Sequence, residues 1–289
     1  MLSATRVTPD VAALADPYGG IVHTSHTLHS VHRAAVYVRS NSAGRLGIVA
    51  IDDVGGLPGG ILVDGVPDFR ALGLNGRGLV LYLSKAATWS PRLPSRARHD
   101  PGPRLMTGVR RARALAAARA GTDGLGPLLA GADAGDAFSR AATIRVAALR
   151  AALTARDGPA AAHEARGLIG LGVGLTPSGD DLLVGLLAAL EATRNPMRAG
   201  LARSIAAEAR SRTTAIGWMA LWHATRGEFA ERLHDVLIAI GLDDADTMER
   251  ATSRATSYGA TSGVDTLVGL FLGLEVATAD RSAVHEAAA

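Results

Sequence analysis

The segment 170–181, with the sequence GLGVGLTPSGDD, is the strongest candidate for chemistry in the chain. Its glycines occupy alternate positions, which lets the backbone turn tightly or approach a ligand closely. Thr176 followed by Pro177 predicts a helix N-cap and first helical residue, with Ser178 as a competing cap. Free amides and the positive dipole end at such a helix start favour an anion such as phosphate, carboxylate or an oxyanion. The predicted binding residues here are Gly172, Gly174, Thr176, Pro177, Ser178 and Gly179.

Two adjacent acids, Asp180 and Asp181, follow the turn and are the catalytic candidates. Neighbouring helical residues are about 100° apart, so we expect that the two side chains do not both face the core. One acid would face the ligand as a base or hydrogen-bond acceptor. The other would cap the helix, bind a cation or orient an arginine.

A purely structural interpretation of this segment stays open. In it, the glycines allow helices to pack closely, Thr176 caps the helix, and the acids favour the helix dipole. The segment is neither a P-loop nor a dinucleotide fingerprint, because no Gly-Lys-Ser/Thr follows it and the preceding residues have a helical pattern.

A shorter echo of the motif occurs at 259–270, GATSGVDTLVGL, if one gap is allowed at Pro177. The alignment places Ser262 on Ser178, Gly263 on Gly179, Asp265 on Asp181 and Gly269 on Gly185. It suggests one structural device used twice, namely a glycine-containing turn that leads into an apolar helix with an aspartate in its first turn.

Two further groups are candidates for substrate contacts. Arg212, Thr213 and Thr214 precede an apolar helix, and the planar guanidinium suits a carboxylate or phosphate. A solvated helix end capped by Thr213 is the alternative. In the amino-terminal part, His29 and Ser30 at a strand edge are candidates for a substrate contact or a domain interface. The spacing of His23, His26, His29 and His32 does not bring them together as metal ligands.

Composition excludes several classes of protein. The chain has 289 residues, 30 basic against 27 acidic residues, and no cysteine, so thiolate catalysis, disulfides and cysteine zinc sites are excluded. Lys85 is the only lysine, which disfavours Schiff-base chemistry. Arginines do not gather in a basic stripe, so no nucleic-acid partner is expected. No signal-peptide pattern is seen and the longest apolar run, 182–190, is too short for a bilayer, so a cytoplasmic protein without membrane contact is expected.

The pattern of residues predicts an α+β protein. A small amino-terminal β-rich module at 1–90, an antiparallel sheet or partly closed barrel, is followed by a Pro/Arg-rich linker or exposed loop at 91–104. A larger, mainly α-helical domain occupies 105–289. Strands are expected at 36–38, 46–51, 60–63 and 78–83. Helices are expected at 105–120, 136–156, 159–170, 179–193, 197–210, 213–226, 228–241, 245–257 and 263–279.

These motifs resemble a bacterial family of oxamate carbamoyltransferase subunits (AllH-like), which acts in purine and allantoin catabolism. The resemblance rests on 172–181, on Arg212-Thr213-Thr214 and on 259–265. His29-Ser30-Val31 and the turn at 55–61 are similar to the opening of that family, so the resemblance spans roughly 20–280.

The resemblance implies carbamoyl transfer between carbamoyl phosphate and oxamate, within an oligomer of different subunits. Both substrates are small anions, which a helix start and an arginine fork would bind. The predicted residues include Ser262, Gly263 and Asp265. No cofactor is expected, although Asp180 and Asp181 leave a divalent cation such as Mg²⁺ open. A non-catalytic structural or regulatory subunit, or a small-carboxylate-binding protein, is the alternative function.

Overall fold

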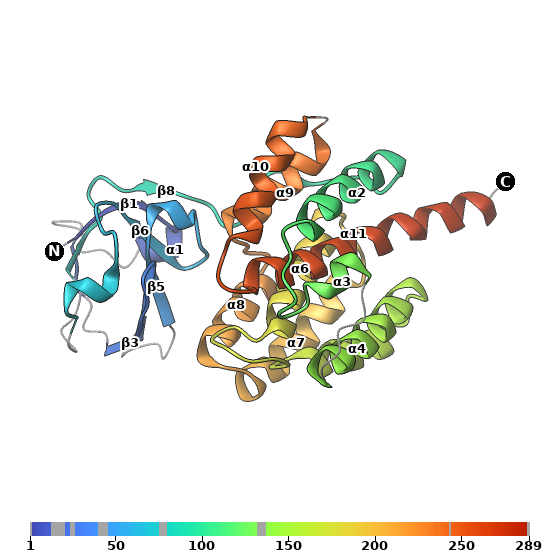
Figure 1. Cartoon of the computed structure of the whole chain (residues 1–289), viewed down its shortest axis with the longest axis horizontal. Coiled ribbons are helices and arrows are strands. Elements are labelled where there is room, and N and C mark those ends of the chain that lie inside the picture. The colour runs from blue at the N-terminus through green and yellow to red at the C-terminus, as the bar shows by residue number, and fades with distance from the viewer. Residues whose placement is uncertain are drawn as a thin grey trace. The chain divides into compact units, whose positions relative to one another are not determined.

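The computed structural model of the chain describes residues 2–12, 21–23, 27–39, 46–74, 80–131, 137–242 and 244–287. It divides into two compact units, Met1–Arg92 and Leu93–Ala289. The first holds the strands and the second is mainly helical, which confirms the predicted α+β class (Figure 1). Each unit has its own cluster of buried hydrophobic residues.

The first unit is built on an eight-stranded mixed sheet with the order β2-β7-β1-β6-β5-β4-β3, and β8 also pairs with β1. The strands are β1 (Leu2–Val7), β2 (Ile21–His23), β3 (Thr27–Val31), β4 (Ala35–Arg39), β5 (Leu46–Ile51), β6 (Gly60–Val63), β7 (Val80–Tyr82) and β8 (Ala87–Thr88). A four-residue helix, α1 (Pro9–Ala12), follows β1. All four residues of β6 are buried, as expected for a strand inside the sheet.

The predicted antiparallel arrangement is wrong for part of this sheet. The pair β5–β6 is parallel, and so are β1–β7 and β1–β8. Parallel neighbours need a connection that returns the chain to the start of the first strand. Between β5 and β6 this return consists of a short 3₁₀ turn at 52–54 and a turn with positive φ at Gly55 and Gly59.

In the second unit, the described residues form the nine predicted helices, with bounds within three residues of the expected ones, except that α11 ends eight residues later than expected. They are α2 (Pro103–Ala117), α4 (Ala137–Thr154), α5 (Gly158–Leu168), α6 (Ser178–Ala192), α7 (Arg198–Arg212), α8 (Ala215–Thr225), α9 (Glu231–Gly241), α10 (Ala245–Thr256) and α11 (Ser262–Ala287). A further helix, α3 (Pro127–Ala130), was not expected, because this single turn lacks a periodic pattern.

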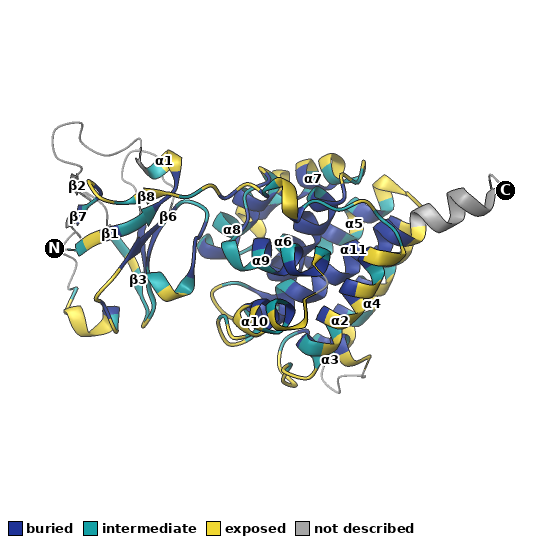
Figure 2. Cartoon of the chain, turned by 90° about the horizontal axis from the view of Figure 1, so that it is seen from above, coloured by how far each residue is buried: buried dark blue, intermediate teal, exposed yellow. Residues whose placement is uncertain are grey.

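Helix α6 lies at the centre of the helical unit, where Figure 2 shows it and most of α11 in the colour of buried residues. Every residue of α6 except Val184 and Glu191 is buried. Gly185 of α6 and Gly269 of α11 form the crossing point of the two helices. A Cβ on Gly185 would lie 1.8 Å from the Thr266 carbonyl oxygen, and one on Gly269 would lie 1.9 Å from that of Leu182. The two helices therefore pack backbone against backbone.

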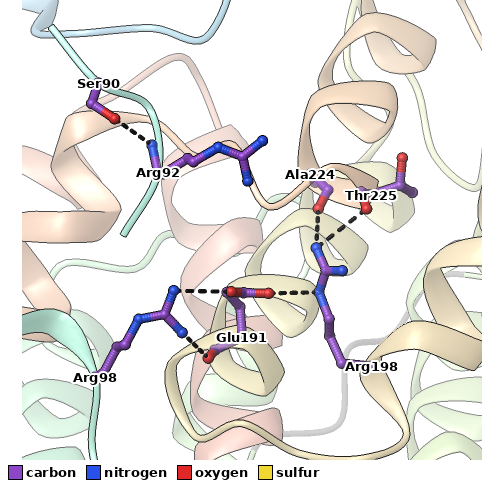
Figure 3. Close-up of polar contacts among 7 residues, drawn as sticks. All are labelled: Ser90, Arg92, Arg98, Glu191, Arg198, Ala224 and Thr225. Atoms are coloured by element: carbon purple, nitrogen blue, oxygen red, sulfur yellow. Dashed lines mark hydrogen bonds and ion pairs between the residues drawn. The ribbon is translucent and has the colours of Figure 1, made fainter. Parts of the chain in front are cut away.

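The end of α6 is held by a polar cluster around Glu191 (Figure 3). Arg98 donates to the Glu191 carboxylate at 3.1 Å and to its carbonyl oxygen at 3.3 Å. Arg198 pairs with the other carboxylate oxygen at 2.9 Å and donates to the carbonyl oxygens of Ala224 and Thr225 at the end of α8. One carboxylate thus connects the segment before α2 with α6, α7 and α8.

Part of the segment expected as a linker packs on the helical unit. Leu93 and Ala97 are buried in the helical core, and the His99 ring Nε2 lies 2.7 Å from the Leu237 carbonyl oxygen. This part of the segment therefore packs against the helices and is not an exposed loop.

A stretch of α11, Ser262–Ala279, is long and apolar enough to cross a membrane by length and composition alone. Of the residues in this stretch, 78% are buried inside the protein, as expected for the core helix of a helical domain.

Candidate functional site at the paired helix starts

The loop before α6 is shaped by its glycines, as predicted. Gly170, Gly172 and Gly174 have φ of +74°, +114° and +101°, a region that L residues rarely adopt. A Cβ on Gly170 would also lie 2.1 Å from the Arg212 carbonyl oxygen. The tip of the loop is at the surface, because Val173 is 91% exposed. The loop thus descends from the surface into the start of a buried helix.

The start of α6 corrects two predictions. Thr176 is not the cap, because Pro177 occupies the N-cap position and no side chain caps the helix. The amide of Gly179 donates to the Leu171 carbonyl oxygen, and those of Asp180 and Asp181 donate to that of Pro177. These three amides are therefore not free to cradle an anion. The carbonyl oxygens of Leu171 and Pro177 accept these hydrogen bonds at the helix start.

Gly179 and its counterpart Gly263 serve close packing. A Cβ on Gly179 would lie 2.0 Å from the Leu168 carbonyl oxygen, and one on Gly263 would lie 1.9 Å from that of Ala255. At these two glycines the structural interpretation of the motif holds.

Asp180 is fully buried and held by two donors. The Gly170 amide donates to its Oδ1 at 2.8 Å, and the Thr213 hydroxyl donates to its Oδ2. Burial raises the pKa of Asp180 to about 6, while these two hydrogen bonds act to lower it. The carboxyl group therefore titrates close to neutral pH.

Asp181 is also buried, which corrects the expectation that only one of the two acids faces the core. Neighbouring side chains leave a helix in different directions, but nearly every residue of α6 is buried, so both acids are enclosed. Burial raises the pKa of Asp181 well above its usual value, and the neighbouring charges of Asp265 and Asp180 raise it further. The hydroxyls of Ser262 and Thr176 act against this shift.

The start of α11 supplies the third buried acid. Oδ1 of Asp265 accepts from the Leu125 amide at 2.6 Å, next to Gly124 with its positive φ. Burial raises the pKa of Asp265, and the Leu125 amide and the hydroxyls of Ser178 and Thr261 act to lower it. No motif in the sequence indicated Gly124 or Leu125, which lie about 140 residues away along the chain.

The echo suggested one structural device used twice, and the structure shows in addition that the two motifs meet and interlock. Thr176 Oγ1 lies 2.8 Å from Ser262 Oγ, so the starts of α6 and α11 are adjacent. Ser262 of the second motif acts on Asp181 of the first, and Ser178 of the first acts on Asp265 of the second. Thr176 and Thr261, which are aligned in the echo, each act on the aspartate of their own motif. The arrangement has the character of a local two-fold.

The step at 212–214 contributes its threonines to this site. Thr213 donates to Asp180, and Thr214 caps α8 by accepting from the Gly217 amide at 2.9 Å while it donates to the Leu175 carbonyl oxygen. The cap of α8 is thus Thr214 and not Thr213. The Arg212 guanidinium pairs with Glu208 on its own helix at 2.8 Å. It is therefore engaged away from the three acids.

The amino-terminal candidates belong to the other unit. His29 and Ser30 are part of β3, where Ser30 Oγ lies 3.4 Å from His29 Nδ1 and 3.1 Å from His32 Nε2. His26 lies outside the described residues. Within the described ranges, no group of three or more His, Cys, Asp or Glu side chains is arranged to hold a metal ion.

Comparison with known proteins adds a family for part of the helical unit. No curated protein and no solved structure matches the chain significantly. One family matches residues 168–274, a segment that starts before the glycine loop and ends within α11. This segment contains the starts of α6 and α11 and leaves His29 and Ser30 outside. The family is described as oxamate carbamoyltransferase subunit AllH.

Proposed function

We propose that this chain is a subunit of a carbamoyltransferase that acts on a small carboxylate or amide such as oxamate. The reaction would join carbamoyl phosphate and oxamate into oxalurate and phosphate. The observation that carries the proposal is the family match over 168–274, because it contains the three buried acids, Asp180, Asp181 and Asp265.

The chemistry of these acids supports the proposal. The amide nitrogen of oxamate attacks the carbamoyl carbon, phosphate leaves, and the nitrogen must lose a proton. A carboxyl group with a pKa of about 6, as at Asp180, accepts a proton effectively near neutral pH. Asp181, whose Oδ2 has no hydrogen-bond partner among the described residues, would accept a hydrogen bond from the NH2 group.

The anion would lie over the turn before α6, in which Val173, Gly174 and Leu175 are exposed. Although the amides of 179–181 are paired within the backbone, the dipoles of α6 and α11 direct their positive ends to the same place, because Thr176 and Ser262 touch. The hydroxyls of Thr176 and Ser262 lie at this place, and one of the two can donate to phosphate or carboxylate while the other donates within the pair.

The remaining features follow from the same proposal. A subunit of this enzyme works with other carbamoyltransferase subunits, so we propose a multi-subunit assembly in the cytoplasm, in purine or allantoin catabolism. We propose that the reaction uses no cofactor, and we treat Mg²⁺ on Asp180 and Asp181 as a variable to be tested.

A thermal-shift screen of the purified chain tests the ligand class. The probes are carbamoyl phosphate, oxamate, oxalurate and phosphate, each with and without Mg²⁺. A ligand that binds the native state raises the melting temperature by mass action, and we expect this for carbamoyl phosphate or oxamate. If none of the four shifts the melting temperature of the chain, alone or with its partner subunits, the proposal fails.

A second candidate is a regulatory or structural subunit, or a small-carboxylate-binding protein. It is favoured by the pairing of the α6 amides and by the ion pair between Arg212 and Glu208, which leave fewer groups available for catalysis. This candidate predicts ligand binding while substitution of Asp181 leaves the turnover of the assembled enzyme unchanged.

A further inference from the structure

The starts of α6 and α11 bury two carboxylate oxygens that lack partners. Asp181 is 7% exposed and Asp265 is fully buried. Oδ2 of each has no hydrogen-bond partner among the described residues. A buried acceptor without a donor is unfavourable, so two in one place favour a ligand that donates hydrogen bonds to them.

The two oxygens belong to aspartates at equivalent positions of the two aligned motifs. Each aspartate stands in the first turn of its helix, has a threonine of its own motif beside it, and has the serine of the other motif beside it. The Asp265 charge also acts on Asp181, so the two carboxyl groups are near neighbours. A ligand that satisfies both aspartates must therefore donate two hydrogen bonds, one to each Oδ2 atom.

We propose that Asp181 and Asp265 together form a two-acceptor site for a terminal NH2 group, with each unpartnered oxygen accepting one N–H. This inference rests on the proposed function for its substrate class, since carbamoyl phosphate and oxamate both end in a planar primary amide group. Oxygens on either side of such a group accept its two hydrogens, whereas a methyl or carboxylate group in its place leaves both acceptors unpaired.

A ligand would reach the two acids from the side of Thr176, Thr261 and Ser262. Thr176, Thr261 and Ser262 are only partly buried, and they stand at the ends of the helices above the two acids. Their hydroxyls contact the carboxyl group of their own or the other motif from that side. The NH2 group of a ligand over this rim would point down between the two helices.

Pyruvate is the decisive probe, because it is oxamate with a methyl group in place of NH2. For the full chain, we expect pyruvate to bind roughly tenfold more weakly than oxamate, or worse, since sites built to bind N–H groups strongly reject analogues that lack them. Equal affinities for the two ligands in the wild-type chain would overturn the inference, and so would failure to bind oxamate, alone or with partner subunits.

Asp265→Asn is the sharpest variant. The Leu125 amide requires an acceptor at the Oδ1 position, so the Asn side chain places its NH2 where Oδ2 was. The variant should bind oxamate at least tenfold more weakly than the wild type does. Its ratio of affinities for oxamate and pyruvate should fall towards one. The control Asp246→Asn, an exposed residue in the first turn of α10, should retain the preference. A preference that Asp265→Asn leaves intact would contradict the site.

Carbamoyl transfer measured on the same preparations separates the two proposals. If the chain prefers oxamate over pyruvate but the assembled enzyme shows no carbamoyl transfer, the proposed function is contradicted and the NH2 site is supported. If carbamoyl transfer occurs but Asp265→Asn keeps the preference for oxamate over pyruvate, only the NH2 site is contradicted. A rise in melting temperature with K⁺ or Mg²⁺ alone, lost in Asp265→Asn and without any oxamate preference, would identify a cation site instead and overturn the inference.

Discussion

At the scale of single residues, Asp180 links the site to the stability of the helical unit. Its ordinary pKa of 3.8 rises to about 6 in the folded chain, because burial disfavours the charge. The native state thus holds a proton that the unfolded chain has already lost. The contribution of this group to stability is fully present below pH 3.8 and is lost as the pH rises through 6.

The first prediction concerns Asp180→Asn, which keeps the size of the side chain and removes its titration. Between pH 4 and 7.5 the free energy of unfolding of the wild type should fall relative to that of the variant by on the order of 2 kcal/mol. Urea unfolding at both pH values measures this difference. An Asp180→Asn difference that does not vary with pH would contradict the assigned shift.

The sequence indicated part of the residue-level picture. The tight turn at the three glycines was predicted from their spacing, and Asp180 and Asp181 were singled out by their position after the turn. That both acids are buried did not follow, because a local pattern does not reveal that a helix is enclosed on every side. The bond from Leu125 to Asp265 depends on a tertiary contact that no local spacing encodes.

At the scale of elements, the crossing of α6 and α11 determines where the two aspartates meet. Gly185 and Gly269 stand four residues after Asp181 and Asp265, respectively, and each faces the backbone of the other helix. The close approach of the helices fixes the distance between their starts. Any side chain at either glycine must push the helices apart.

The second prediction is that Gly185→Ala destabilises the chain and weakens ligand binding together. The new Cβ would overlap the Thr266 carbonyl oxygen, and overpacking of this kind costs roughly 1–3 kcal/mol or more. The matched control is Gly200→Ala in α7, where nothing lies near the new Cβ and alanine should stabilise the helix by about 0.5–1 kcal/mol. Chemical unfolding compares the two; equal stabilities for both variants would refute the crossing.

Elements in the helical unit could be predicted well because apolar residues recur with a helical period over long segments. Strands β4 to β7 were also expected at their places, since short β-branched runs lie between glycine turns. Pairing was less predictable. Whether β6 runs parallel or antiparallel to β5 depends on the path of the connection, and the composition of the strands does not determine it.

At the scale of the whole molecule, the chain consists of two units with separate hydrophobic cores. The family match lies within the helical unit, together with the three buried acids.

The third prediction follows from the separate cores. A fragment of residues 93–289 should retain its helical circular dichroism and unfold cooperatively, because its buried cluster lies within these residues. It should also keep the preference for oxamate over pyruvate that the full chain shows. A fragment that is unfolded at 25 °C would mean that the helical core depends on the first unit.

The most direct test of the account is the turnover of the assembled enzyme with Asp181→Asn in this chain. Oxamate-dependent release of phosphate from carbamoyl phosphate is measured for the complex with its co-expressed subunits, after assembly has been checked for both forms. Because Asp181→Asn loses the acceptor for the substrate NH2 group, the account predicts a loss of roughly tenfold or more in turnover, and near-wild-type turnover for Asp246→Asn. Unchanged turnover in an intact Asp181→Asn complex would contradict it.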